Sequence, residues 1–420
     1  MKLKLLMFSL LSAFMVNGQG VSKKVLFLGN SYTSVNNLPK MVADIANSMG
    51  DVLIFDANTP GGQTLKQHST NVTSLTKIEV GNWDYVVLQE QSQYPSFPNQ
   101  QVANEVFPYA RFLDSIINVE NPCAETVFYM TWGRKNGDAS NCPGWPPVCT
   151  YVRMDSLLNL RYRQMATNNN GIISPVGAVW RYIRQNHPSI ELYQSDESHP
   201  SLAGTYAAAC AFYSIIYRKD PSLITFDSGL SAVDAANIRA AAKLITYNNL
   251  LEWHVGEYDP IANFTFSNTG AGQVSFTNSS TNATDFVWSF GDGTTSNEGS
   301  PTHTYVSNGT YNVMLEVDKC GVKDTVVKTI TVTALGIESQ KKNPSFVRIY
   351  PNPSQGNIHL KVTHELIGSD YVIYDNTGKV LSTGVVDSEE TKLDLNSLLN
   401  GFYHIRVGSN WVWKISLFKN

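Results

Sequence analysis

Lys24-Val-Leu-Phe-Leu-Gly-Asn-Ser-Tyr-Thr33 is an apolar run that ends in a tight turn presenting a serine. Consecutive apolar residues without polar alternation are typical of a strand buried on both faces of a sheet. Comparable runs predict strands at 52–55, 85–88, 126–131 and 172–173. Helical periodicity predicts helices at 38–49, 101–119, 151–166, 176–185, 202–217 and 232–253. This alternation predicts a parallel α/β domain of three layers over residues 19–257.

The composition changes after residue 257, where Thr, Ser, Asn and Gly become frequent and apolar residues alternate with polar ones. Strands are expected at 264–266, 274–277, 286–290, 311–317 and 325–332, which indicates a small antiparallel β-sandwich over 260–335. A polar link at 338–344 precedes a third unit over 344–420. Its expected strands lie at 347–350, 358–362, 371–374, 380–386, 392–395 and 401–407. The predicted fold class is therefore α/β followed by two all-β sandwich domains.

The charge and the first residues limit the possible partners and compartment. The chain has 31 Lys and Arg against 35 Asp and Glu, a net charge of −4, and no basic run, so nucleic acid is not expected as a partner. Residues 1–18 combine Lys2 and Lys4 with a short apolar stretch and small residues, which predicts a signal peptide cleaved between Gly18 and Gln19. No later segment has about 18 consecutive apolar residues, so no transmembrane segment is expected and we expect an exported protein.

The chain has five cysteines, so at least one cannot pair internally. Cys142 and Cys149 bracket a short, proline-rich loop and are the best candidates for a disulfide in an oxidising compartment. Metal binding by this pair is the alternative, although no histidine or second cysteine pair lies nearby at ligand spacing. Cys210, in an alanine-rich run, is expected in the core.

Ser31 and a distant Asp196-Glu-Ser-His199 segment together supply the side chains of nucleophilic acyl transfer. A serine hydroxyl needs a base at neutral pH, and His199 can take and return its proton. Asp196, three residues earlier, can hold the imidazole in the required tautomer. Glu197 is the alternative acid and is expected to face solvent. Ser31 could instead cap a helix or occupy a turn.

A second histidine serves as an internal comparison. Asn186-His187-Pro-Ser189 nearly copies Ser198-His199-Pro-Ser201 but has no acid three residues earlier. His187 is therefore expected to be a surface residue.

Residues 22–257 resemble the SGNH (GDSL-like) hydrolases, secreted esterases and lipases on a flavodoxin-like α/β/α sandwich. Gly29-Asn-Ser31 matches the first block with Asn in place of Asp, and Asp196-Glu-Ser-His199 matches the last. The resemblance implies that Ser31, Asp196 and His199 are the catalytic residues. It also implies that the reaction needs no metal or organic cofactor.

The middle blocks of this family imply the oxyanion donors. In Gly61-Gly-Gln-Thr64, Gly62 is the expected backbone donor, although it could be only a turn residue with positive φ. The third block departs from the family, since Gln89-Glu-Gln-Ser92 stands where Gly-x-Asn-Asp is usual. Gln91 keeps an amide donor and is the expected third member with the Ser31 N–H, while Glu90 is its rival.

Trp132-Gly-Arg134 follows the fourth expected strand, at the edge where α/β sheets bind ligands. Trp132 is expected to pack in the core. Arg134 is a possible substrate contact.

The last two domains also resemble known families. Trp288-Ser-Phe-Gly-Asp-Gly293 resembles the motif of PKD domains, in which Trp288 and Phe290 are expected in the core and Asp292 in a turn. Ile349-Tyr-Pro-Asn-Pro-Ser-Gln-Gly356 and Gly401-Phe-Tyr403 resemble the C-terminal sorting domain of the type IX secretion system of Bacteroidota. This second resemblance implies the type IX machinery as a partner and a secreted or cell-surface location.

These patterns together predict a secreted serine esterase that removes O-acyl groups, acetyl above all, from carbohydrate or glycoconjugate. Carbohydrate is inferred from the accompanying domains and not from the site. The alternatives are a catalytically inactive surface carbohydrate-binding protein and an esterase or lipase for longer acyl chains.

Overall fold

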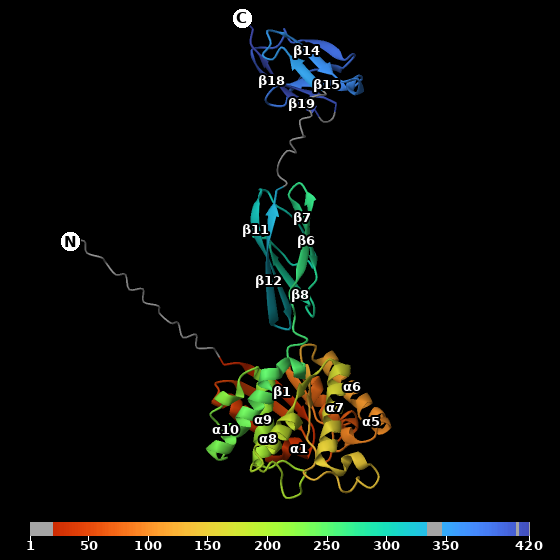
Figure 1. Ribbon diagram of the computed structural model, residues 1–420, viewed down its shortest axis with the longest axis vertical. Helices are drawn as coiled ribbons and strands as arrows, with labels where there is room; N and C mark the ends of the chain where they lie inside the picture. Colours follow the sequence, from red (N-terminus) through yellow and green to blue (C-terminus); the bar gives the residue numbers. More distant parts are fainter. Residues whose placement is uncertain (1–19, 334–346, 409–410, 420) are drawn as a thin grey trace, which may run out of the picture. The chain divides into compact units, whose positions relative to one another are not determined.

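The computed structural model describes residues 20–333, 347–408 and 411–419 (Figure 1). The predicted signal peptide at 1–18 and the polar link at 338–344 lie outside the described residues. One compact unit includes the α/β domain and most of the first β-sandwich, and a second unit includes the second β-sandwich.

The first domain is built on a five-stranded parallel sheet with the strand order β2-β1-β3-β4-β5. Its strands are β1 (Ser22–Leu28), β2 (Val52–Asn58), β3 (Tyr85–Leu88), β4 (Glu125–Tyr129) and β5 (Ile172–Ser174). The run from Val25 to Leu28 is completely buried, as expected for a central strand covered on both faces. This strand order is that of flavodoxin-like folds, so the predicted fold class is confirmed.

Helices cover both faces of this sheet, with β1 between them (Figure 1). On one side, α9 (Leu202–Tyr217) packs against α2 (Leu38–Ser48), α8 (Val176–Asn186) and α10 (Ala232–Ile245). On the other side, α6 (Phe107–Glu120) packs against α3 (Leu65–His68), α4 (Val72–Glu79), α5 (Asn99–Glu105) and α7 (Tyr151–Asn169). The one-turn helix α1 (Ser31–Ser34) follows β1 directly.

The structure corrects two expectations about helices and adds two short helices. The helix expected at 101–119 is broken at Val106, because Pro108 has no N–H to donate and its ring clashes with the preceding turn. The helix expected at 232–253 ends at Ile245 and continues as a 3₁₀ segment, Tyr247–Trp253. Helices α3 and α4 were not predicted, because they are short and mostly polar.

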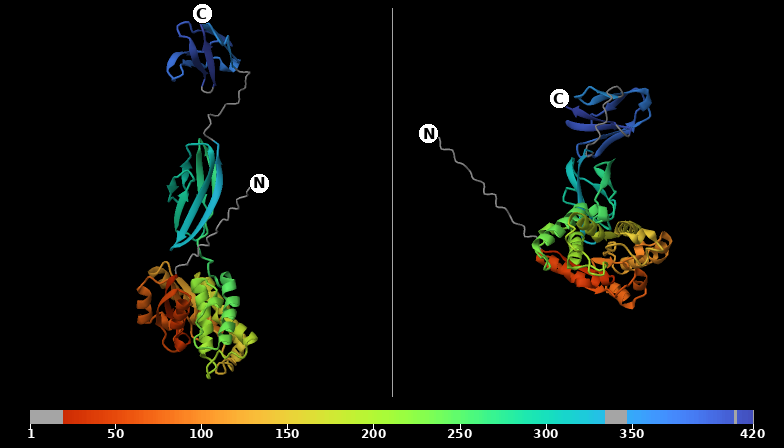
Figure 2. Two further views of the ribbon diagram at one scale, coloured as in Figure 1. Left: turned by 90° about the vertical axis from the view of Figure 1, so that its left-hand side faces the viewer. Right: turned by 60° about the horizontal axis from the view of Figure 1, so that its bottom comes forward.

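The first β-sandwich has two antiparallel sheets. One contains β6 (Phe264–Gly270), β7 (Gln273–Asn278) and β10 (Thr302–Thr304), and the other contains β8 (Asp285–Ser289), β9 (Thr295–Ser296), β11 (Gly309–Lys319) and β12 (Val322–Val332) (Figure 2). Trp288 and Phe290 are buried in its core, as predicted, and the Trp288 ring lies 5.0 Å from that of Phe264. Asp292 accepts hydrogen bonds from Thr294 and so stabilises a turn.

The second β-sandwich has its own apolar core, which includes Ile358, Leu360, Ile405 and Ile415. Its sheets contain β13 (Val347–Tyr350), β14 (Asn357–Val362) and β17 (Glu390–Asp394), and β15 (Asp370–Tyr374), β16 (Val380–Val385), β18 (Gly401–Val407) and β19 (Trp411–Leu417). Strand β19 is an addition to the strands expected from the sequence.

Two disulfides are present in the first unit. Cys142 pairs with Cys149, and Cys123 of the α/β domain pairs with Cys320 of the first β-sandwich. Cys210 is buried and unpaired. The Cys123–Cys320 bond was not predicted, since 197 residues separate its partners. Among the described helices, none combines the length and apolar character needed to cross a membrane.

Candidate active site

Ser31 is held at the carboxyl end of β1 by the turn that precedes it. The Asn30 side chain caps α1 by accepting a hydrogen bond from the Tyr32 N–H, while the Asn30 N–H donates to Gln89 Oε1 at 2.9 Å. A Cβ at Gly29 would lie 2.6 Å from Thr33 Oγ1 and 2.7 Å from Gln89 Oε1, so this turn requires glycine. Ser31 is thus the first residue of a helix, and its N–H has no partner within that helix.

The structure brings Ser31, His199 and Asp196 together. His199 Nε2 lies 2.8 Å from Ser31 Oγ, and His199 Nδ1 is hydrogen-bonded to Asp196 Oδ2. Asp196 Oδ1 also accepts the backbone N–H groups of Ser198 at 3.1 Å and His199 at 3.0 Å. The partial burial of Asp196 acts to raise its pKa, but these hydrogen bonds, that from His199 first, hold the pKa below its usual value. Asp196 is therefore suited to remain a carboxylate beside the imidazole.

The rival residues lie elsewhere. The Glu197 carboxylate accepts hydrogen bonds from Asn136 Nδ2 and does not contact His199. His187 caps the end of α8, with its ring 6.2 Å from that of Tyr182. Of the two similar His-Pro segments, the one that contains His199 contacts Ser31 and the one that contains His187 does not.

An aromatic stack, formed by Tyr32, Trp132 and Trp180, supports the loop that carries His199. The Tyr32 ring lies parallel to Trp132 at 4.6 Å, and Trp132 lies parallel to Trp180 at 3.8 Å. Trp132 Nε1 donates to the Ser198 carbonyl oxygen at 3.1 Å, and the Tyr32 and Ser198 hydroxyls are 2.7 Å apart. Trp132 is fully buried, as predicted. The role of the stack at Ser198 was missed, although the position of Tyr32 directly after Ser31 was a visible signal.

The expected oxyanion donors lie in two loops. Gly62 is exposed and has a φ of +69°, which favours glycine even though open space surrounds the position. Gln91 Nε2 donates to Gln93 Oε1, and Gln91 Oε1 accepts the Gln93 N–H at 2.9 Å. One hydrogen of the Gln91 amide is therefore engaged by its neighbour and the other is left to donate.

Glu90 connects these two loops from the inside. Its fully buried carboxyl group accepts the Leu65 N–H at 3.2 Å and the Gln91 N–H at 2.6 Å. Burial raises the pKa of Glu90 to about 8, although the two backbone hydrogen bonds act to lower it. The carboxyl group is therefore a link between the second and third blocks.

Arg134 lies on a loop joined to the His199 segment. The Lys135 N–H donates to the Glu197 carbonyl oxygen at 2.9 Å. Arg134 Nη1 donates to the buried Asp138 at 3.1 Å, while Arg134 Nε is buried and has no hydrogen-bond partner in the structure. The Nε–H of the Arg134 guanidinium group is thus an unused hydrogen-bond donor on a loop joined to the His199 segment.

The arrangement places a hydroxyl, an imidazole and a carboxylate in one hydrogen-bonded row, which is the order of groups that acyl transfer by a serine uses. Within residues 20–333, 347–408 and 411–419, no group of three or more His, Cys, Asp or Glu side chains is placed to hold a metal ion.

Comparison with known proteins identifies the two β domains. Residues 258–334 match the PKD domain and residues 348–415 match the secretion system C-terminal sorting domain, which confirms both resemblances. The sorting domain indicates type IX secretion to the cell surface or the outside. A microbial collagenase from Vibrio alginolyticus is 41% identical over 85 residues, which are 18% of this chain and 10% of the collagenase. The chain thus spans about a tenth of the length of the curated relatives it matches.

Two solved structures are similar to the α/β part. A DUF4886 family protein from Bacteroides uniformis is 16% identical with a TM-score of 0.47, covering 55% of this chain and 95% of that one. A candidate SGNH hydrolase from Slackia heliotrinireducens is 25% identical with a TM-score of 0.39, covering 46% of this chain and 98% of that one.

Proposed function

We propose that the α/β domain is a serine esterase in which Ser31 forms the acyl-enzyme. The observation that carries the proposal is the 2.8 Å contact between Ser31 Oγ and His199 Nε2, with Asp196 bonded to the other ring nitrogen. A serine is activated when one nitrogen of a histidine ring is hydrogen-bonded to its hydroxyl and the other nitrogen is hydrogen-bonded to a carboxylate.

The reaction proceeds in two stages. Ser31 Oγ attacks the ester carbonyl carbon while His199 Nε2 takes the hydroxyl proton. The bond to the alcohol oxygen then breaks, and the alcohol leaves with the proton from His199. A water molecule next attacks the acyl-enzyme with His199 as base, which releases the carboxylic acid and restores Ser31. Asp196 holds Nδ1–H toward itself and stabilises the imidazolium in both stages.

The oxyanion of each tetrahedral intermediate needs fixed donors. We assign this role to the N–H groups of Ser31 and Gly62 and to the Gln91 side chain. Loss of one such donor costs about 3–4 kcal/mol of transition-state stabilisation in serine hydrolases.

For the substrate we propose O-acyl groups, acetyl above all, on carbohydrate or glycoconjugate. The support is the PKD domain and the sorting domain on the same chain, which is an association and not the chemistry of the site. The alternative, a catalytically silent surface binding protein, is favoured by the engagement of the Gln91 amide with Gln93.

Labelling by a fluorophosphonate and hydrolysis of p-nitrophenyl acetate test the proposal together. Ser31→Ala and His199→Ala are expected to abolish both signals. The matched controls are Ser34→Ala, on the same short helix, and His187→Ala, the second His-Pro segment, and both should retain activity. An unlabelled wild-type chain would favour the silent binding protein. Rates that rise with acyl length on longer p-nitrophenyl esters would favour a lipase instead of an acetyl esterase.

A further inference from the structure

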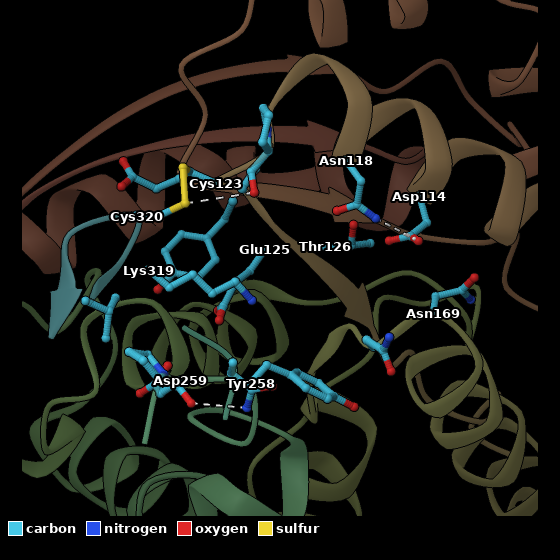
Figure 3. Close-up of a pocket in the computed structure, with 18 of the residues that line it drawn as sticks. Asp114, Asn118, Cys123, Glu125, Thr126, Asn169, Tyr258, Asp259, Lys319 and Cys320 are labelled. Atoms are coloured by element: carbon cyan, nitrogen blue, oxygen red, sulfur yellow. Dashed lines mark hydrogen bonds between the residues drawn. A yellow bond between two sulfur atoms is a disulfide. The ribbon is translucent and has the colours of Figure 1, made fainter. Parts of the chain in front are cut away.

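A cavity of about 580 Å³ lies at the opposite edge of the sheet from Ser31. Figure 3 shows residues that line it. Its lining includes Lys23 near the start of β1, Asp84 just before β3 and Glu125 at the start of β4. Ser31 follows the other end of β1, a strand of seven residues. At ~3.3 Å per residue, about 20 Å of strand therefore separates this cavity from the candidate active site.

The cavity has walls from both the α/β domain and the first β-sandwich, and two connections hold these walls together. One is the Cys123–Cys320 disulfide, both of whose residues line the cavity (Figure 3). The other is the ion pair in which both terminal nitrogens of Arg218 donate to Asp259. Because a disulfide and a bidentate ion pair fix the walls relative to each other, the cavity is expected to be formed before any ligand binds.

The chemistry of the lining is polar and nearly neutral. Four basic and four acidic side chains line it, and Lys23–Asp84 and Arg218–Asp259 are ion pairs, so no ion of either sign is favoured. Amide side chains contribute donors and acceptors, as at Asn118 and Asn169, and Tyr258 contributes a ring (Figure 3). Glu125 Oε2, an acceptor, and Thr126 Oγ1, a hydroxyl that can donate and accept, have no hydrogen-bond partner among the described residues. The site is therefore rich in hydrogen-bonding groups, and two of its oxygen atoms are unused.

The cavity continues into a second one of about 550 Å³. The two share Arg111, Asn168 and Asn169, and the second adds Phe107 and Pro108. Tyr85 and Tyr258 contribute rings to the first cavity, and Phe107 contributes one to the second. The two cavities together form a groove, and a ligand that occupies both of them would be extended.

We propose that this groove binds a neutral oligosaccharide and so forms a glycan-binding site separate from the candidate active site. Sugar hydroxyl groups both donate and accept hydrogen bonds, and their apolar faces pack on aromatic rings. An extended peptide fits less well, because the lining offers few apolar side chains to form pockets for those of a peptide. The equal numbers of basic and acidic side chains disfavour nucleic acid.

Calorimetric titration of the full chain with xylotriose, chitotriose and maltotriose tests the proposal. At least one trisaccharide should bind, and Asn168→Leu and Arg111→Leu, both on exposed helix positions of the groove, should weaken it by about tenfold or more. Asn47→Leu, an exposed helix position outside the groove, is the matched control and should leave binding unchanged. Circular dichroism of each variant checks the fold.

A second set of measurements distinguishes binding in the groove from binding at the candidate active site. Ser31→Ala should bind the same trisaccharide as tightly as the wild type, whether or not the chain proves to be an esterase. If the fluorophosphonate labels the chain, the labelled chain should bind the trisaccharide equally tightly. The proposal is overturned if no trisaccharide binds at millimolar concentrations, or if the groove variants bind like Asn47→Leu. Binding of gelatin that the groove variants abolish, without sugar binding, would assign the groove to a peptide and also overturn it.

Discussion

The Tyr32 hydroxyl lies 2.7 Å from the Ser198 hydroxyl, so the residue after Ser31 holds the residue before His199. The two chain segments that carry the candidate nucleophile and base are 166 residues apart at this contact. Tyr32 is buried and stacked on Trp132, which itself donates to the Ser198 carbonyl oxygen. Ser198 is therefore fixed at both its side chain and its backbone by rigid aromatic groups.

Tyr32→Phe is expected to lower kcat by about twofold to tenfold with little change in KM. The substitution keeps the ring and removes one hydrogen bond, worth about 0.5–1.5 kcal/mol, that positions His199. Steady-state hydrolysis of p-nitrophenyl acetate measures the effect. Because Tyr32 and Ser198 act as a pair, Ser198→Ala should add little to Tyr32→Phe in a double-mutant cycle.

Tyr217→Phe is the control for a purely structural effect. The Tyr217 hydroxyl donates to the Val52 carbonyl oxygen at 2.8 Å, at the other end of the sheet. Tyr217→Phe should lower the free energy of unfolding about as much as Tyr32→Phe does, but it should leave kcat unchanged. If both variants keep the wild-type kcat, Tyr32 does not position the base.

Asp196→Asn is expected to lower kcat by about 10²–10⁴-fold. The amide would donate to His199 Nδ1 or leave it unpaired, so the imidazole would lose the tautomer that accepts the Ser31 proton. Glu197→Gln is the matched control, since its carboxylate contacts Asn136 and not His199. Equal losses in the two variants would contradict the assignment of Asp196.

The sequence was sufficient to predict the five strands of the parallel sheet and three residues that the structure brings into one hydrogen-bonded row. Strand β3 and helix α9 have the predicted bounds, because continuous apolar runs leave few alternatives. Ser31, Asp196 and His199 could be predicted because each follows a recognisable block. The hydrogen bonds between them, and the roles of Tyr32 and Trp132, depend on side chains that meet only after folding.

The cysteines show where sequence reasoning stops. The seven-residue separation of Cys142 and Cys149 is a local pattern, and the structure pairs them. The Cys123–Cys320 pair depends on how the first β-sandwich meets the α/β domain, which no local pattern encodes. The position of Glu90 is a second example: the sequence offered it as the rival of Gln91, whereas its completely buried side chain links the two loops.

Glu90→Gln is expected to reduce the pH dependence of stability. The folded-state pKa of about 8 lies above the ordinary value of 4.5, so between these values the native state binds more protons than the unfolded state. Stability contributed by the protonated carboxyl is therefore lost as pH rises from about 4.5 to about 8, at up to about 1.4 kcal/mol per pH unit. Urea unfolding at pH 5 and pH 8 should show a larger loss for the wild type than for Glu90→Gln.

The exposed Glu120, on α6, provides the control for this experiment. Glu120→Gln should show the same pH dependence as the wild type. The interpretation of Glu90 would be wrong if Glu90→Gln also followed the wild type between pH 5 and pH 8.

The two disulfides should differ in their contribution to stability because they close loops of very different length. In the chain-entropy model, a bond across 197 residues stabilises by roughly 5 kcal/mol and one across 7 residues by roughly 2 kcal/mol. Replacing Cys123 and Cys320 with alanine should therefore lower the urea midpoint more than replacing Cys142 and Cys149. The long-range bond also joins two domains, so its loss should separate their unfolding into two transitions. A single transition with equal midpoints in both variants would mean that noncovalent contacts, such as Arg218–Asp259, already join the domains.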